Sequence, residues 1–196
     1  MRIISLVPAA TEILADLGAA DHLVAISHDS DHPASIRHLP RVTASLLKGN
    51  ESSAQIDARL RAARGVGETT IVLAAEEIRT LQPDLIVTQA LCEVCAVSEG
   101  AVRRLGAVIK PAPDVLTLSG RTIAGVIYDI LRLGEQIGTA EVRAEADRLT
   151  NRMEERLLTI RDRARTQRRG AAPRRVLCLE WLDPIFLAGH WVPELV

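Results

Sequence analysis

The chain has 196 residues and a formal net charge of −1, so its overall charge does not favour a nucleic-acid partner held by bulk electrostatic attraction. Hydrophobic residues make up 47% of the sequence, which excludes global disorder and allows a sizeable core. No apolar run has the length of a bilayer-spanning helix, so none is predicted.

The first 27 residues have the pattern of a strand–helix–strand unit. Residues 2–7, RIISLV, form a β-branched apolar run typical of a buried parallel strand, and Pro8 ends it. Apolar side chains at helical spacing then continue up to Gly18, and residues 22–27 have the pattern of a second strand. A unit this short favours parallel pairing of the two strands.

The next hundred residues alternate between helix and strand patterns. Ser98 is a candidate helix cap, and Gly106 and Gly138 are candidate helix stops. We predict a loop over 28–42, helices over 52–65, 73–82, 97–106 and 117–138, and strands over 83–89 and 107–112. The predicted fold class is α/β, with a parallel-sheet, Rossmann-like lobe that has helices on both faces.

A single narrow apolar stripe predicts one long helix from Thr139 to about Arg168. The stripe consists of Val142, Ala146, Leu149, Met153, Leu157 and Ile160. At about 1.5 Å per residue the helix would be roughly 45 Å long. It is interpreted either as a plain surface helix or as a spacer between two lobes.

The last segment predicts the opening of a second lobe. A basic turn at 168–175 leads to an apolar strand at 176–180, and a lone strand cannot bury itself. We therefore expect an N-terminal α/β ligand-binding lobe at 1–138, a backbone spacer helix at 139–170, and the first strand of a truncated C-terminal lobe within 171–196.

Two polar segments that follow predicted strands carry possible ligand-binding side chains. Loops at the carboxyl ends of parallel strands gather at one edge of the sheet, so the two segments can meet there. Three interpretations stay open: residues that line a cleft, ligands of a metal, or a thiol-redox pair. The side chains are His28, Asp29, Asp31 and His32 in HDSDH, and Cys92 and Cys95 in LCEVC.

The aromatic residues gather at the C-terminal end. Three of the four lie in the last 16 residues, among them Trp181 and Trp191. A glycine beside His190 and Trp191 allows close approach of a planar ligand, which would bind by stacking and apolar contact. A core role for these rings, and a solvated role for His190, are the ordinary alternatives.

The sequence contains no Gly-x-Ser-x-Gly, P-loop or dinucleotide-binding fingerprint, so a non-catalytic protein is expected. The N-terminal stretch lacks the unbroken apolar core of a secretory signal. As written, the chain is therefore expected to be cytoplasmic, or periplasmic or membrane-anchored if a leader is missing. Its three cysteines fit a reducing compartment.

Several motifs together resemble one family, the helical-backbone (class III) solute-binding proteins of ABC importers. PAATEIL and LVAIS are similar to the opening of these proteins, and LQPDLIVTQ is similar to a strand that faces their cleft. The long helix is similar to their backbone helix. SHDSDHP, LCEVCAVS and CLEWLDPIFLAGHWVPELV resemble the vitamin-B12-binding-like branch. The resemblance covers essentially the whole chain.

The resemblance implies a protein that binds a corrinoid or another metal chelate between two lobes, with Gln89 in the cleft. It implies ABC permease subunits as partners, with Glu12 pairing with permease arginines, and no nucleic acid. No resident cofactor is implied, but a metal ion at Cys92, Cys95, His28 and His32 is left open. The alternatives are an iron–siderophore or haem carrier of the same fold, and an intracellular metal or thiol-redox protein that uses Cys92 and Cys95.

Overall fold

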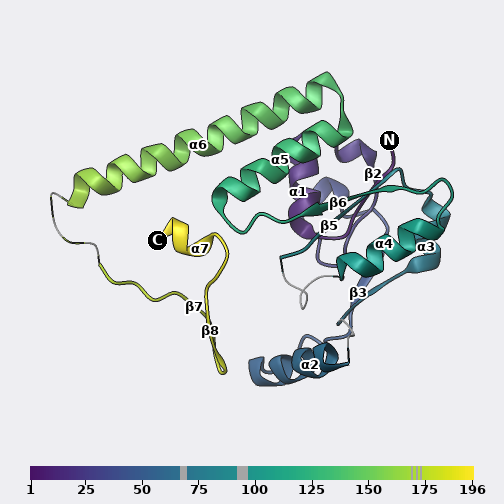
Figure 1. Cartoon of the computed structure of the whole chain (residues 1–196), viewed down its shortest axis with the longest axis horizontal. Coiled ribbons are helices and arrows are strands. Elements are labelled where there is room, and N and C mark those ends of the chain that lie inside the picture. Colours follow the sequence, from purple (N-terminus) through teal and green to yellow (C-terminus); the bar gives the residue numbers. More distant parts are fainter. Residues whose placement is uncertain (67–69, 92–96, 169, 171, 173) are drawn as a thin grey trace.

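A four-stranded parallel sheet lies at the centre of the protein (Figure 1). The structure is a computed structural model that describes residues 1–66, 70–91, 97–168, 170, 172 and 174–196. The strand order is β2-β1-β5-β6, and each neighbouring pair is parallel. The strands are β1 (Ile3–Ser5), β2 (Leu23–Ala25), β5 (Leu85–Gln89) and β6 (Asp114–Leu118). The predicted α/β class with a parallel sheet is confirmed.

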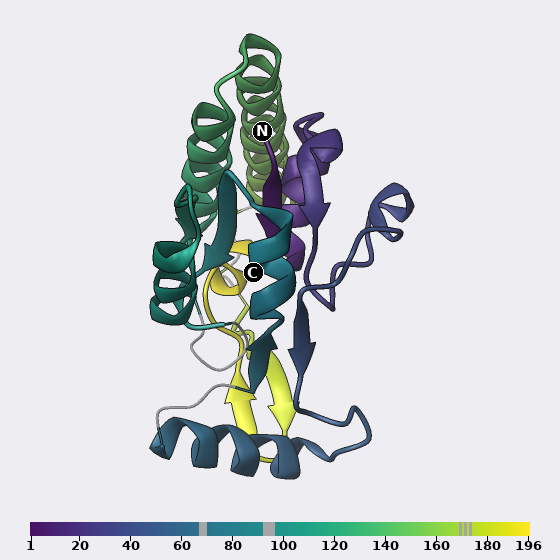
Figure 2. The same ribbon diagram turned by 90° about the vertical axis from the view of Figure 1, so that its right-hand side faces the viewer.

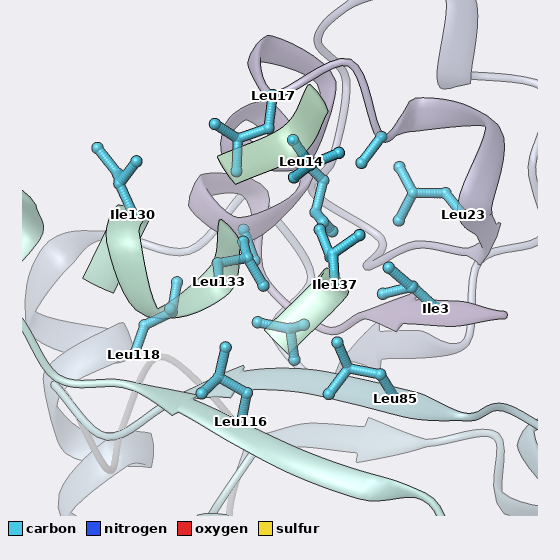
Figure 3. Packing of buried hydrophobic residues seen from close by; sticks show 14 of the residues in the cluster. Ile3, Leu14, Leu17, Leu23, Leu85, Leu116, Leu118, Ile130, Leu133 and Ile137 are labelled. Atoms are coloured by element: carbon cyan, nitrogen blue, oxygen red, sulfur yellow. The ribbon is translucent and has the colours of Figure 1, made fainter. Parts of the chain in front are cut away.

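Helices cover both faces of this sheet. One face packs against α1 (Pro8–Asp16) and α5 (Ile123–Ile137), and the other against α3 (Ala75–Leu81) and α4 (Glu99–Val108). Alternate residues of β5 serve the two cores: Leu85 belongs to the first and Ile86 to the second. Figure 3 shows the first core, where Leu14 of α1 and Leu133 of α5 lie over Leu85.

The predicted strand at 107–112 is wrong. Helix α4 continues past Gly106 to Val108, and the strand that pairs with β5 is β6. Gly106 lies inside the helix and faces Pro113 and Val115, where a Cβ would make ordinary contacts at 3.6 Å. The predicted helix at 117–138 likewise begins later. Its first residues complete β6, and the Thr122 side chain caps α5 by accepting a hydrogen bond from the Gly125 amide.

A smaller antiparallel pair, missed by the sequence analysis, lies beside the main sheet. It joins β3 (Thr43–Ser45) to β4 (Ile71–Leu73), and the predicted helix at 73–82 starts only after β4. The predicted helix at 52–65 is confirmed as α2 (Ser53–Gly65), which lies apart from the four-stranded sheet (Figure 2). Short 3₁₀ turns occur at η1 (Ala20–His22) and η2 (Ala34–Ile36).

The long helix is confirmed as α6 (Ala140–Arg168), and its apolar stripe has two parts. Val142 and Ala146 are buried against the first core, where Gly134 of α5 allows a close approach to Ala146. Farther along, Ile160 is 60% exposed. In Figure 1 the helix runs beside α5 at its start and then extends past the lobe. None of the helices in the described part of the chain is both long and apolar enough to cross a membrane.

The C-terminal segment forms a hairpin and one short helix. The expected strand at 176–180 begins only at Leu179, and β7 (Leu179–Leu182) pairs with β8 (Ile185–Leu187) across an Asp-Pro turn. The hairpin supplies its own backbone partners, so the strand is not alone, although Leu182 and Ile185 stay exposed. Helix α7 (Val192–Leu195) follows. The division of the chain into lobe, spacer and second lobe stays a prediction.

Candidate functional site

A cavity of about 490 Å³ lies at the carboxyl ends of β5 and β6. In open parallel sheets this edge is the usual place for a ligand. Its described lining residues are Ala9 and Ile13 on α1, Gln89 and Leu91 at the end of β5, Leu118 and Gly120 at the end of β6, Ile123, Val126 and Asp129 on α5, Met153, Arg156, Leu157 and Ile160 on α6, and Trp191 and Leu195 at α7.

Buried hydroxyl groups hold the α1 wall in place. The Thr11 hydroxyl donates to Ser5 Oγ at 2.8 Å and lies 2.9 Å from Ser30 Oγ, which is 2.8 Å from Ser27 Oγ. All four side chains are buried, so these bonds are shielded from competing water. The network fixes the start of α1 to the end of β1 and to the loop after β2.

The Asp129 carboxylate holds the wall between β6 and α5. Its Oδ2 accepts hydrogen bonds from the backbone amides of Ser119 and Gly120, both at 2.7 Å, and its Oδ1 lies 3.2 Å from an Arg132 nitrogen. Asp129 is 3% exposed, so its charge needs these partners. A side chain at Gly120 would place its Cβ 2.5 Å from the Val126 nitrogen, so the turn requires glycine.

The C-terminal segment closes another side of the cavity. Glu194 of α7 accepts a hydrogen bond from the Ile123 amide at 2.8 Å, at the start of α5. This amide is one of those that an α-helix leaves without an internal partner, and the helix dipole favours a carboxylate there. This hydrogen bond joins residues that are 71 positions apart in the sequence. It places Trp191 and Leu195 at the cavity that α5 and α6 also line.

The lining is mostly aliphatic, with one tryptophan. Among the described lining residues, the charged ones are Asp129 and Arg156, and Gln89 adds an amide. Such a surface suits a large, largely uncharged ligand that is oriented by a few polar contacts.

The comparisons with known proteins agree with this architecture. No protein-family model matches the chain, and no curated protein matches it. Among solved structures, the periplasmic vitamin B12 binding protein BtuF of Vibrio cholerae matches 98% of this chain at 26% identity with a TM-score of 0.61. The chain has the class III solute-binding fold.

Other solved structures match with similar TM-scores and lower sequence identity. A periplasmic haem-binding protein from Pseudomonas aeruginosa matches 91% of the chain at 20% identity, with a TM-score of 0.62. An ABC transporter substrate-binding protein from Listeria monocytogenes matches 100% at 17% identity, with a TM-score of 0.60. The chain spans 61%, 52% and 61% of the Vibrio, Pseudomonas and Listeria proteins, respectively.

Of the predicted ligand-binding residues, Gln89 and Trp191 line the cavity of this class III lobe. Trp181 instead packs edge-on against Phe186 in the hairpin, with ring centroids 5.5 Å apart. His190 is exposed, and its ring centroid lies 5.8 Å from that of Trp191. The aromatic residues expected to form one surface are therefore divided between hairpin and cavity.

The HDSDH segment lies at the carboxyl end of β2, which β1 separates from β5. The His28 Nδ1 atom lies 2.7 Å from Thr43 Oγ1, and its Nε2 atom lies 3.3 Å from Asp29 Oδ2. Asp31 and His32 are exposed. These side chains share the sheet edge with the cavity but do not line it, and their role in binding stays a prediction.

Cys92 and Cys95 lie outside the described residues, so their expected meeting with HDSDH is untested. In the described part of the chain, no group of three or more histidine, cysteine or acidic side chains could hold a metal ion. Glu12 is exposed on α1, the helix whose Ala9 and Ile13 line the cavity.

Two carboxyl groups outside the cavity have a lowered pKa. The hydrogen bond from Arg103 lowers the pKa of Glu99 in α4, and those from Arg148 and Arg152 lower the pKa of Glu145 in α6. A carboxyl group whose pKa is lower in the folded state stabilises the fold at pH values above its ordinary pKa of 4.5. That stabilisation is lost as the pH falls through the lowered pKa. The ion pairs of Glu99 and of Glu145 therefore stabilise α4 and α6 at neutral pH.

Sequence reasoning missed Asp129 and Arg156 as cavity residues. Asp129 carried a usable signal, because it lies between Val126 and Leu133 on the apolar face of a predicted helix. A carboxylate on such a face needs buried partners. Arg156 carried no comparable signal, since arginine is frequent along the whole length of α6.

Proposed function

We propose that this chain binds a corrinoid, or a related planar metal chelate, in the cavity between α1, α5, α6 and α7. The observation that carries the proposal is the match of 98% of the chain to a vitamin B12 binding protein, at the highest identity of the three neighbours described. The cavity lies at the ligand-binding edge of the sheet, which supports the proposal. Because the chain spans 61% of that protein, the activity, ligand and partners are all proposals.

The charge of the cavity favours a corrinoid over an anionic siderophore. A siderophore complex with several negative charges calls for clustered cations, whereas Arg156 is the one cation among the described lining residues. Haem is the second candidate, because a haem-binding protein is among the structural neighbours. The thiol-redox alternative rests on Cys92 and Cys95, so the described residues do not favour it.

We further propose that the protein delivers its ligand to an ABC permease, with Glu12 as a contact for permease arginines. Glu12 is exposed on α1, and the same helix lines the cavity, so docking and binding would share one element. The neighbours are substrate-binding proteins rather than enzymes, which supports a non-catalytic role. Those described as periplasmic support the same compartment here.

Titration calorimetry with cyanocobalamin, dicyanocobinamide, haemin and a ferric siderophore tests the proposal. We expect saturable binding of one corrinoid per chain. Leu157→Gln should weaken binding because Leu157 lines the cavity, whereas Leu158→Gln is the matched control, since Leu158 is 47% exposed beside it and outside the lining. Binding of siderophore alone would overturn the corrinoid assignment, and no binding at all would overturn the function.

A further inference from the structure

The two charged side chains among the described lining residues differ in whether protein groups already neutralise their charge. Asp129 is buried, and two backbone amides and Arg132 satisfy its carboxylate. It therefore has little capacity left for a ligand. Arg156 is exposed at the α6 wall, between apolar residues that line the same cavity.

The preceding arginines of α6 form ion pairs, whereas Arg156 forms none with any residue that the structure describes. Arg143 pairs with Glu135, and Arg148 and Arg152 both pair with Glu145. Within the described part of the chain, no carboxylate forms an ion pair with Arg156. Among the described lining residues, the one positive charge, that of Arg156, is thus available to a ligand.

We propose that Arg156 binds a single anionic oxygen group at the edge of an otherwise apolar, planar ligand, and so sets ligand specificity. A guanidinium matches the two oxygens of a phosphodiester or a carboxylate with paired hydrogen bonds. In cobalamin that group is the phosphodiester of the nucleotide loop, and in haem it is a propionate. The inference rests on the proposed function, because it assigns a role within the same cavity.

The test compares Arg156→Gln with the unchanged chain on two matched ligand pairs. Cyanocobalamin has the phosphodiester and dicyanocobinamide lacks it; haemin has free propionates and its dimethyl ester does not. Arg163→Gln is the control, because Arg163 is exposed on α6 and outside the cavity lining. We expect Arg156→Gln to weaken binding of the member that carries the anionic group, in one pair, about fivefold, as for an exposed charge pair. The affinity for the member that lacks this group should not change, and Arg163→Gln should leave the affinity for all four ligands unchanged.

The outcomes separate the inference from the proposed function. Selective loss of cyanocobalamin affinity identifies a phosphodiester, and selective loss of haemin affinity identifies a carboxylate; either result supports a role for Arg156. Equal effects on both members of each pair, or no effect, overturn that role and leave the proposed function standing. If the unchanged chain binds none of the four ligands, the proposed function fails and the inference fails with it.

Discussion

Two glycines set how closely the walls of the cavity approach one another. A Cβ at Gly134 would lie 2.8 Å from the Ala146 Cβ, and one at Gly120 would lie 2.5 Å from the Val126 nitrogen. The first contact joins α5 to α6, and the second shapes the turn after β6. A larger side chain at Gly134 must therefore displace α6, and one at Gly120 must displace the start of α5.

We predict that Gly134→Ala lowers the free energy of unfolding by about 1–3 kcal/mol through overpacking, even though alanine is the better helix former. Gly100→Ala in α4 is the matched control. Its Cβ would meet only the end of the flexible Arg104 side chain, at 3.3 Å, so this variant should be neutral or stabilised. Urea unfolding measures both. Equal stability of the two variants would show that α5 and α6 are not tightly packed at Gly134.

Asp129 supports the cavity wall, and its removal should be costly. We predict that Asp129→Ala lowers the free energy of unfolding by about 3 kcal/mol, because the buried Gly120 amide, the part-buried Ser119 amide and Arg132 lose a charged acceptor. Asp162→Ala, at an exposed position of α6, should change the same free energy by less than about 0.5 kcal/mol. Thermal unfolding of both variants tests this, and similar melting temperatures would contradict the role given to Asp129.

The helices and strands differ in how well the sequence predicts them. The first strand–helix–strand unit and α6 carry long, regular apolar patterns, and both are confirmed. Strands β3 and β4 were missed. They are as short as β1, but each buries only its first residue, whereas all three residues of β1 are buried, so they lack the continuous buried run that marks β1. At 107–112, apolar residues suggested a strand, but Ile109 is buried as the end of α4.

Within the part of the chain that the structure describes, one hydrogen bond, from the Ile123 amide to Glu194, tethers α7 to α5, so it can be tested alone. We predict that Glu194→Ala speeds hydrogen exchange of the Ile123 amide and of residues 192–195, because the carboxylate that caps α5 is lost. Exchange in β5 should not change, since its amides belong to the main sheet. Glu180→Ala in the exposed part of β7 is the control. Unchanged exchange at Ile123 would mean that the tether does not hold the C-terminal segment.

The cavity as a whole could not have been predicted, because its lining comes from segments as far apart as Ala9 and Leu195. The sequence indicated the sheet edge where this cavity lies, and two residues that it proposed for ligand binding, Gln89 and Trp191, line the cavity; their role in binding stays a prediction. It could not show that β1 separates HDSDH from the β5 end, since strand order depends on packing of the whole lobe. The grouping of Met153, Leu157 and Ile160 with Trp191 likewise depends on how the C-terminal segment folds back.

The indole N–H signals of the two tryptophans show most directly whether a corrinoid binds in this cavity. Trp191 lines the cavity and Trp181 packs in the hairpin, and a Trp181→Phe variant assigns the two signals. On titration with cyanocobalamin, we predict that the Trp191 signal shifts saturably while the Trp181 signal stays in place. A shift of Trp181 alone, or corrinoid binding that leaves Trp191 unmoved, would contradict the assignment of this cavity as the binding site.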